Sequence, residues 1–422
     1  MTGIAPSTSF AAPRGGSQTA VSSAPAAAVS GRDPRLDFYR GLAMFIILIA
    51  HIPYNAWAGG IPARFGFSDA TEIFVFCSGM ASAVAFGGAF LRRGWLMGTA
   101  RVLFRCWQVY WAHICLFFFT LTAMAALDLY GGFDKSYIDD LNLRFVMDDP
   151  APQLVGMFTL TYVPNYFDIL PMYLVILAML PLVMALARIG TWAVALFCVA
   201  LWSAANIGSI HFPAEPWSAR EWFFNPFGWQ LLFFTGFAFM RGWIPAPPVS
   251  RALVWICAAF LILSAPIGSW KVFEWVNAAA PALGDSLRGV WRGIDALDKA
   301  TGFALRDKTD FSILRYLHFL ALAYVAWVAA GPGGAHLRAV ASGAAGEVWR
   351  GLLAIVTKVG QQSLAVFVAS MAIARLLGFV LDQIGRTGAS YALVNLIGFA
   401  IIIAVAYVAG WFKSQPWKTK RT

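Results

Sequence analysis

Long apolar segments recur along the chain from residue 39 almost to its end. Ten of these segments are long enough, or nearly long enough, to cross the ~30 Å hydrocarbon core of a bilayer as helices. They cover about residues 39–57, 69–91, 102–126, 167–187, 191–208, 227–241, 251–269, 313–330, 361–382 and 391–412. The polar stretches between them contain no soluble domain and no repeat of fixed period. The pattern predicts an all-α polytopic membrane protein, a bundle of about ten transmembrane helices.

The composition agrees with this fold class. Hydrophobic residues make up 59% of the 422 positions and charged residues only 12%, whereas soluble domains are about a quarter charged. The five cysteines all lie inside apolar segments and no pair has metal-ligand spacing, so we expect packing thiols and no bound metal. The net charge of +10 indicates a membrane orientation rather than a nucleic-acid partner, because of where the charges lie.

The charges predict the orientation. If the N-terminus is cytosolic, the short loops on that side carry arginine and lysine with almost no acidic residues. The long loops on the other side, 127–166, 209–226 and 270–312, mix basic residues with most of the Asp and Glu. This distribution satisfies the positive-inside rule with both termini in the cytosol.

Two tails flank the predicted membrane domain of residues 31–412. Residues 1–30 are rich in Ala, Ser, Gly, Thr and Pro, with Arg14 as their one charge. We expect a disordered cytosolic tail there rather than a secretory signal peptide, since no long apolar core is present. Residues 413–422 are expected to form a short basic cytosolic tail.

The first apolar segment contains an arginine and a histidine eleven residues apart, Arg40 and His51. Eleven residues make about three helical turns and ~16 Å of rise, so both side chains project from nearly the same face. A cation at the membrane boundary with a titratable base halfway through is costly unless it is used. On spacing alone, a functional pair is as plausible as a boundary anchor with a hydrogen-bonded histidine.

Other charged residues sit at the predicted cytosolic face. Arg40, Arg101 and Arg105 together are suited to an anionic cytosolic ligand, because arginine is the preferred partner of phosphate. The alternative is plain positive-inside anchoring. We favour anchoring for Arg92 and Arg93, and ligand binding for the more deeply placed Arg40 and Arg105.

A second group approaches the outer half of the bilayer. A carboxylate from Glu72 or Asp168 near His51 would fix the imidazole tautomer and raise its basicity, as a general base for acyl transfer requires. The alternative for Glu72 is a structural ion pair with Arg375 or Arg315.

The remaining candidates carry weaker signals. His113 and His318 lie within apolar segments, where lone histidines are usually hydrogen-bonded core residues. The sequence contains no glycine-rich phosphate loop, nucleophile elbow or zinc signature. Aromatic residues in the predicted outer loops fit either an interfacial belt or stacking on sugar rings: Tyr130, Tyr137, Tyr162, Tyr166, Trp217, Trp222, Phe223 and Phe224.

Several of these motifs resemble a known superfamily. The Arg40–His51 spacing within the first helix, the Phe-rich Ser-Gly run at 74–80, and Arg101 and Arg105 resemble the first three helices of the membrane acyltransferase-3 superfamily. The third motif departs from the usual pattern. Three residues rather than two separate its arginines, and a valine replaces the expected proline.

A closer resemblance covers nearly all of the chain past residue 31. The runs 68–76, 168–173 and 225–230, and less specifically 315–321, resemble the OpgC branch, the succinyltransferases of osmoregulated periplasmic glucans. The resemblance implies ten helices in the bacterial inner membrane, a succinyl-CoA donor from the cytosol and a glucan acceptor in the periplasm, with no permanently bound cofactor. It also implies that His51 is the essential base and Arg40 a donor-binding residue.

These observations combine into one hypothesis. The arginines of the cytosolic face hold the phosphates of the donor. His51 deprotonates a glucan hydroxyl with help from Glu72 or Asp168. The free carboxylate of the succinyl group is bound by Arg315 or Arg375. The alternatives are an O-acetyltransferase of another envelope glycan, a glycan transporter or flippase, and a scaffold for glucan export. The lack of an internal repeat weighs modestly against a transporter.

Overall fold

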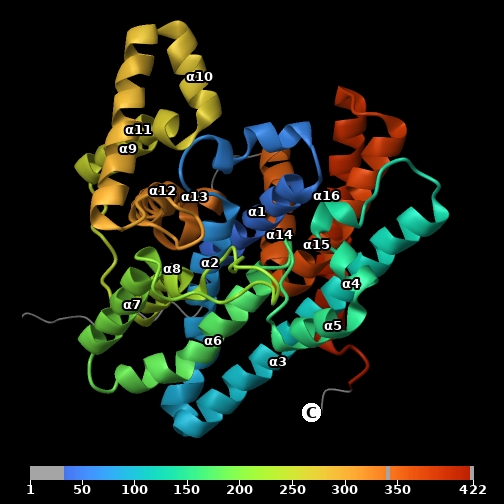
Figure 1. The fold of residues 1–422 in the computed structure, drawn as a ribbon. Helices are drawn as coiled ribbons and strands as arrows, with labels where there is room; N and C mark the ends of the chain where they lie inside the picture. The colour runs from blue at the N-terminus through green and yellow to red at the C-terminus, as the bar shows by residue number, and fades with distance from the viewer. Residues whose placement is uncertain (1–32, 339–342, 419–422) are drawn as a thin grey trace, which may run out of the picture. The chain divides into compact units, whose positions relative to one another are not determined.

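The computed structural model describes residues 33–338 and 343–418 of the chain. The predicted tail at 1–30 and the last four residues of the predicted tail at 413–422 lie outside the described residues. The described residues are almost entirely helical or irregular, with one isolated antiparallel bridge between Pro213 and Glu221 (Figure 1). The predicted all-α class is therefore confirmed.

The described residues form α-helices of very different length. They are α1 (Pro34–His51), α2 (Ala70–Ser82), α3 (Gly88–Tyr130), α4 (Arg144–Asp148), α5 (Pro150–Thr159), α6 (Ile169–Leu186), α7 (Thr191–Asn206), α8 (Pro226–Arg241), α9 (Arg251–Gly268), α10 (Trp270–Ala279), α11 (Pro281–Thr301), α12 (Ile313–Ala330), α13 (Ala335–Arg338), α14 (Gly343–Gln361), α15 (Ser363–Ile384) and α16 (Gly388–Ser414). Short 3₁₀ turns are η1 (Ala56–Gly60), η2 (Pro62–Arg64), η4 (Asp139–Leu141) and η5 (Pro332–Gly334), and η3 (Ala83–Gly87) is a π-helical turn.

Each apolar segment expected from the sequence is helical over most of its length. Six helical stretches in the described part of the chain are long and apolar enough to cross a membrane: 70–130, 169–186, 251–268, 313–330, 363–384 and 388–414. Helices α7 and α8 have only 16 residues each, and α1 carries three charged residues in its 18. The protein is thus a multi-pass membrane protein.

The second and third predicted segments form one continuous helical stretch, Ala70–Tyr130. The break between them is at Gly94, whose φ of 78° and ψ of 173° depart from helical values. Glycine adopts this positive φ without the steric cost that a Cβ would bring. A single kinked residue therefore replaces the loop that the hydropathy pattern suggests.

Six of the described helices were not expected from the sequence: α4, α5, α10, α11, α13 and α14. They occupy stretches treated as loops, because their apolar residues are interspersed with polar ones and form no long apolar run. Helix α14, for example, packs against α1 with part of its surface and leaves residues such as Val348 and Leu352 exposed. Short amphipathic helices of this kind give no membrane-span signal.

Close backbone contacts hold α1 in place. The glycines Gly41 on α1 and Gly360 on α14 lie where the two helices meet, and a Cβ on either would collide with a carbonyl group of the partner helix, that of Val356 or Asp37. The same arrangement joins α2 to α8 through Gly79 and Gly236. Small residues let membrane helices approach this closely and gain van der Waals contact.

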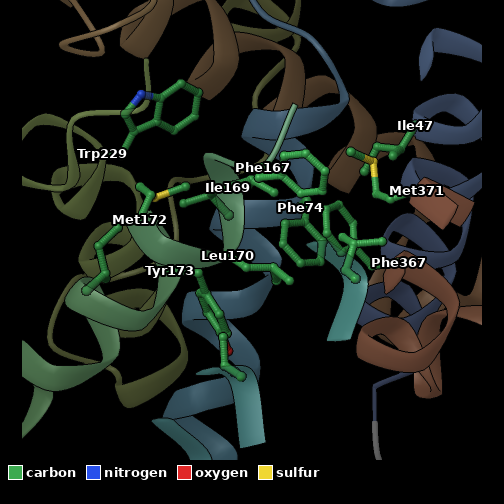
Figure 2. Packing of buried hydrophobic residues seen from close by; sticks show 14 of the residues in the cluster. Ile47, Phe74, Phe167, Ile169, Leu170, Met172, Tyr173, Trp229, Phe367 and Met371 are labelled. Carbon is green, nitrogen blue, oxygen red and sulfur yellow. The ribbon is translucent and has the colours of Figure 1, made fainter. Parts of the chain in front are cut away.

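The buried core lies between α1, α2, α6 and α15 (Figure 2). Phe74 of α2 stacks on Phe367 of α15, with ring centroids 5.5 Å apart and planes 19° apart. Figure 2 shows Ile47 of α1 beside Met371 of α15 on one side of this pair, and Leu170 of α6 on the other. This core fixes the C-terminal half of α1, where His51 lies.

The substitution Gly360→Ala should destabilise the fold, because the added methyl group forces α14 away from the Asp37 carbonyl. Overpacking of this kind costs about 1–3 kcal/mol. The matched control is Gly351→Ala on the same helix, where a Cβ meets no atom within 4 Å. The control should be neutral or slightly stabilising. Thermal unfolding in detergent compares the two, and equal melting temperatures would contradict the close contact.

Candidate functional site

His51 is the last residue of α1, and the helix ends there because Pro53 follows closely. Pro53 pushes Ile52 into extended backbone, φ −69° and ψ 117°. The His51 ring is half-buried, and its Nδ1 lies 2.7 Å from the carbonyl oxygen of Ile47, one turn earlier. A carbonyl oxygen only accepts, so Nδ1 carries the proton of the neutral ring. Nε2 therefore keeps its lone pair and is the basic nitrogen of His51.

Tyr166, in the loop before α6, packs edge-on against His51, with ring centroids 5.5 Å apart. Its hydroxyl donates a hydrogen bond of 2.5 Å to the carbonyl oxygen of Met371 on α15. Its φ is +91°, a left-handed conformation that costs a non-glycine residue about 1–3 kcal/mol. Burial raises the pKa of the Tyr166 phenol above its ordinary value, although the nearby Arg375 opposes this shift. Tyr166 therefore stays neutral and acts as a fixed wall beside the imidazole.

The guanidinium of Arg375 also lies close to the Tyr166 ring. Its Cζ is 5.7 Å from the centroid of the Tyr166 ring, within the range of a cation–π contact. Its Nη2 lies 3.3 Å from Asp140 Oδ2. The charge of Arg375 also acts on His51.

Further ion pairs link Arg375 to the segment that follows His51. Lys135 lies 3.0 Å from Asp140 and 3.2 Å from Asp382. Arg386 pairs with Asp382 at 2.6 Å and donates to the carbonyl oxygens of Pro53 and Tyr54 at 2.9 and 3.2 Å. We call this set the Arg375 cluster: Lys135, Asp140, Arg375, Asp382 and Arg386.

A second set, the Glu72 network, consists of Glu72, Asp69, Lys308 and Arg315. Arg315 donates to Glu72 Oε1 from both Nε, at 2.9 Å, and Nη2, at 2.5 Å. Lys308 pairs with Asp69 at 2.6 Å, and Arg315 Nη2 lies 3.9 Å from the same carboxylate. The other oxygen of Glu72 accepts from the Asp69 backbone in a capping box at the start of α2.

Glu72 thus forms the ion pair with Arg315 that the sequence offered as its structural alternative. It is completely buried, and its described hydrogen bonds go to Arg315 and Asp69 rather than to His51. Asp168 is also buried, at the N-terminal end of α6, and its Oδ1 has no hydrogen-bond partner among the described residues. The hydrogen-bond partner that the structure gives to His51 is a backbone carbonyl, where the sequence led us to expect a carboxylate.

A cavity of about 950 Å³ is lined by α1, α3, α15 and α16. It contains the cations Arg40, Arg105 and Lys413. Arg40 donates a hydrogen bond to the hydroxyl of Ser363, and Arg105 donates one of 3.1 Å to Gln108. The other lining residues include amide and aromatic side chains, namely Gln361, Gln362, Phe104, Trp107, Trp111 and Phe119. We call this the Arg40 cavity.

Two of the three arginines predicted to bind an anionic ligand are therefore in one cavity. Arg101 is exposed one turn before Arg105 and is not part of the lining. Lys413, which the sequence placed only in a basic tail, contributes from α16 instead. Its position could not be read from the sequence, because it depends on where α16 packs.

The two predicted core histidines differ. His318 is a hydrogen-bonded core residue, as expected, since its Nδ1 lies 2.7 Å from the hydroxyl oxygen of Ser68. His113 is equally buried, but neither ring nitrogen has a hydrogen-bond partner within the part of the chain that the structure describes. The charged residues that act on His51 are Lys308, Asp69 and Arg375, of which the sequence singled out only Arg375. It named Tyr166 only as one of many outer-loop aromatics.

A sequence model of the protein family described as "OpgC protein" matches residues 32–414. The match covers every described element from α1 to α16. No curated protein and no solved structure matches the chain.

Removing one partner of the Glu72–Arg315 pair should strongly destabilise the protein, because the other charge is left buried. We expect Glu72→Gln or Arg315→Met to cost about 3–5 kcal/mol each, and the double variant to recover most of the loss. The surface pair of Asp285 and Arg288 provides the control, since Asp285→Asn should cost less than about 1 kcal/mol.

Unfolding in detergent is measured for the wild-type protein, the two single variants and the double variant, which together give the coupling energy between Glu72 and Arg315. Asp285→Asn is unfolded beside them as the control. A stable Glu72→Gln protein that has lost only activity would contradict a structural role for this pair and favour a catalytic one.

Proposed function

Because the chain belongs to the OpgC family of membrane acyltransferases that modify glucans, we propose that it transfers a succinyl group from cytosolic succinyl-CoA to a hydroxyl group of periplasmic glucan. The observation that carries the proposal is the placement of two functional groups on α1. Arg40 lines a cavity with two other cations, and His51, three turns further on, has a basic Nε2.

The proposed topology places the protein in the bacterial inner membrane. Its ten apolar segments span the bilayer, with α2 and the second half of α3 counted separately, and both termini lie in the cytosol. Residues 1–30 and 413–422 are then cytosolic tails on a single membrane domain, 31–412. The distribution of arginine and lysine in the short loops supports this orientation. In it, the Arg40 cavity faces the cytosol and His51 the outer half of the membrane.

The donor binds in the Arg40 cavity. Coenzyme A carries several phosphate groups, and Arg40 and Arg105 provide guanidinium donors for them, with Lys413 as a third positive charge. The aromatic and amide lining suits the remainder of the donor molecule. No cofactor is permanently bound in this proposal, since succinyl-CoA is a substrate.

The chemical step is an acyl transfer. A glucan hydroxyl approaches His51, and Nε2 removes its proton as the oxygen attacks the thioester carbonyl. The resulting tetrahedral intermediate collapses, the C–S bond breaks, and the protonated imidazole returns its proton to the coenzyme A thiolate. The Ile47 carbonyl holds the ring in the required tautomer throughout. Of the two carboxylates expected from the sequence, Asp168 contributes at a distance in this proposal, by stabilising the imidazolium, whereas Glu72 holds Arg315.

Substitution of His51 by alanine should abolish succinyl transfer and leave the protein folded, because the side chain is only half-buried. Purified protein is given succinyl-CoA or acetyl-CoA with periplasmic glucan, and free coenzyme A and glucan mass are followed. A well-expressed His51→Ala protein with full activity would remove His51 as the base. A mass gain with acetyl-CoA alone would retain the mechanism and change the acyl group to acetyl.

The arginines of α3 provide a matched pair for the donor site. Arg105→Ala should raise KM for succinyl-CoA about 10-fold or more, because one charge-assisted contact to phosphate is lost. Arg101→Ala, one turn away and outside the cavity, should change KM less than twofold. Equal effects of the two substitutions on KM would place the donor elsewhere.

A further inference from the structure

The two ion-paired sets near His51 differ in their balance of charge. In the Glu72 network, the described ion pairs join two cations, Lys308 and Arg315, to two carboxylates. In the Arg375 cluster they join three cations to only two carboxylates, Asp140 and Asp382. The described ion pairs of the Arg375 cluster therefore leave one positive charge in excess, and this matters most at the most buried member of the cluster, because an unmatched charge is expensive to bury.

The surplus is concentrated at Arg375. Its side chain is 10% exposed, and its Nε is buried without a hydrogen-bond partner among the described residues. Its contact with Asp140 uses Nη2 alone, at 3.3 Å, and Asp140 is shared with Lys135. A guanidinium has five N–H donors in a planar fork that matches a carboxylate. Most of that capacity is open at Arg375.

Arg315, by contrast, already has a carboxylate partner. Its Nε and Nη2 both donate to Glu72, and its guanidinium also lies near Asp69. A carboxylate that bound this Nε–Nη2 edge of Arg315 would have to displace Glu72, which also caps α2. Arg315 also lines a separate cavity of about 340 Å³ with Lys308 and Arg306. Of the two arginines that the sequence offered for a substrate carboxylate, Arg375 is the one whose Nε is buried without a partner among the described residues.

Arg375 is also placed correctly with respect to His51. The ring of Tyr166 contacts both groups, with its centroid 5.5 Å from that of the His51 ring and 5.7 Å from the Arg375 Cζ, so both border the same aromatic ring. In a succinyl group, two methylene groups separate the thioester carbonyl from the free carboxylate, a span of roughly 4 Å. In the binding mode considered, the carbonyl of a four-carbon diacid lies beside His51 and its carboxylate extends along the Tyr166 ring toward Arg375.

We propose that Arg375 determines acyl specificity by binding the free carboxylate of a dicarboxylic acyl group, with Tyr166 as the wall that sets its distance from His51. The inference rests on the proposed function, because it requires an acyl donor at His51. It adds the residue that distinguishes a diacid from an uncharged acyl group.

The test compares succinyl-CoA with butyryl-CoA, an isostere that has a methyl group in place of the carboxylate. Glucan acylation by the full-length protein is measured with each donor. Arg375→Gln should lower kcat/KM for succinyl-CoA 10- to 100-fold, the usual effect of losing a charge-assisted contact, and change kcat/KM for butyryl-CoA less than threefold. Arg375→Lys, which keeps the charge but not the fork, should recover part of the loss.

A second variant tests the same site in the opposite direction. Asp140→Asn removes the carboxylate that competes for Arg375 and increases the surplus charge, so it should lower KM for succinyl-CoA about threefold and leave KM for butyryl-CoA unchanged. A purely structural role for the cluster would give no such gain. This variant also decides the question if Arg375→Gln does not fold.

The results separate failure of the inference from failure of the proposed function. Parallel losses for both donors in Arg375→Gln, or no loss for either, would overturn the role of Arg375. A selective loss for succinyl-CoA in the double variant Glu72→Gln, Arg315→Met, which is expected to keep the fold, would move the carboxylate to Arg315. If the wild-type protein acylates glucan with butyryl-CoA and not with succinyl-CoA, the cluster does not bind a carboxylate. If it uses neither donor, the proposed function fails first.

Discussion

The close backbone contact of α1 with α14 is the constraint on which the site depends. Gly41 and Gly360 let the two helices touch, and this contact fixes a helix that holds a cavity cation at one end and the imidazole at the other. The separation of Arg40 and His51 along α1 is then set by helical rise alone. Side-chain rearrangement cannot change it, so the distance between the Arg40 cavity and the imidazole is built into a single element.

The two sets of ion pairs near His51 differ in whether their positive and negative charges are matched. Burying a charge is tolerated when partners satisfy it. The Glu72 network meets this condition through the double contact with Arg315 and the capping box of α2. The Arg375 cluster does not meet it, because it has more cations than carboxylates and leaves the Arg375 Nε without a partner. Arg315 and Arg375 are both largely buried, and the number of carboxylate contacts that each makes is what distinguishes them.

The sequence predicts the helical segments well, because long apolar runs have few other solutions in a bilayer. It also identifies the pair of Glu72 and Arg315 as one alternative, since few buried charges exist and each needs a partner. The contact between His51 and the Ile47 carbonyl could not be anticipated in the same way, because it depends on the ring orientation at the end of α1. Nor could the link from Arg375 to Asp140, which joins residues 235 positions apart. Tyr166 stands out in the sequence only as one of several outer-loop aromatics, since its place beside His51 comes from an unusual backbone angle in a loop.

The kink at Gly94 has a consequence for how the chain enters the membrane. Within the helical stretch from Ala70 to Tyr130, the α3 backbone departs from helical values at Gly94, next to Arg92 and Arg93, so no hydrophilic loop separates the two apolar halves. The two halves are therefore joined by a turn with almost no spare chain. We expect them to enter the membrane together, as a helical hairpin.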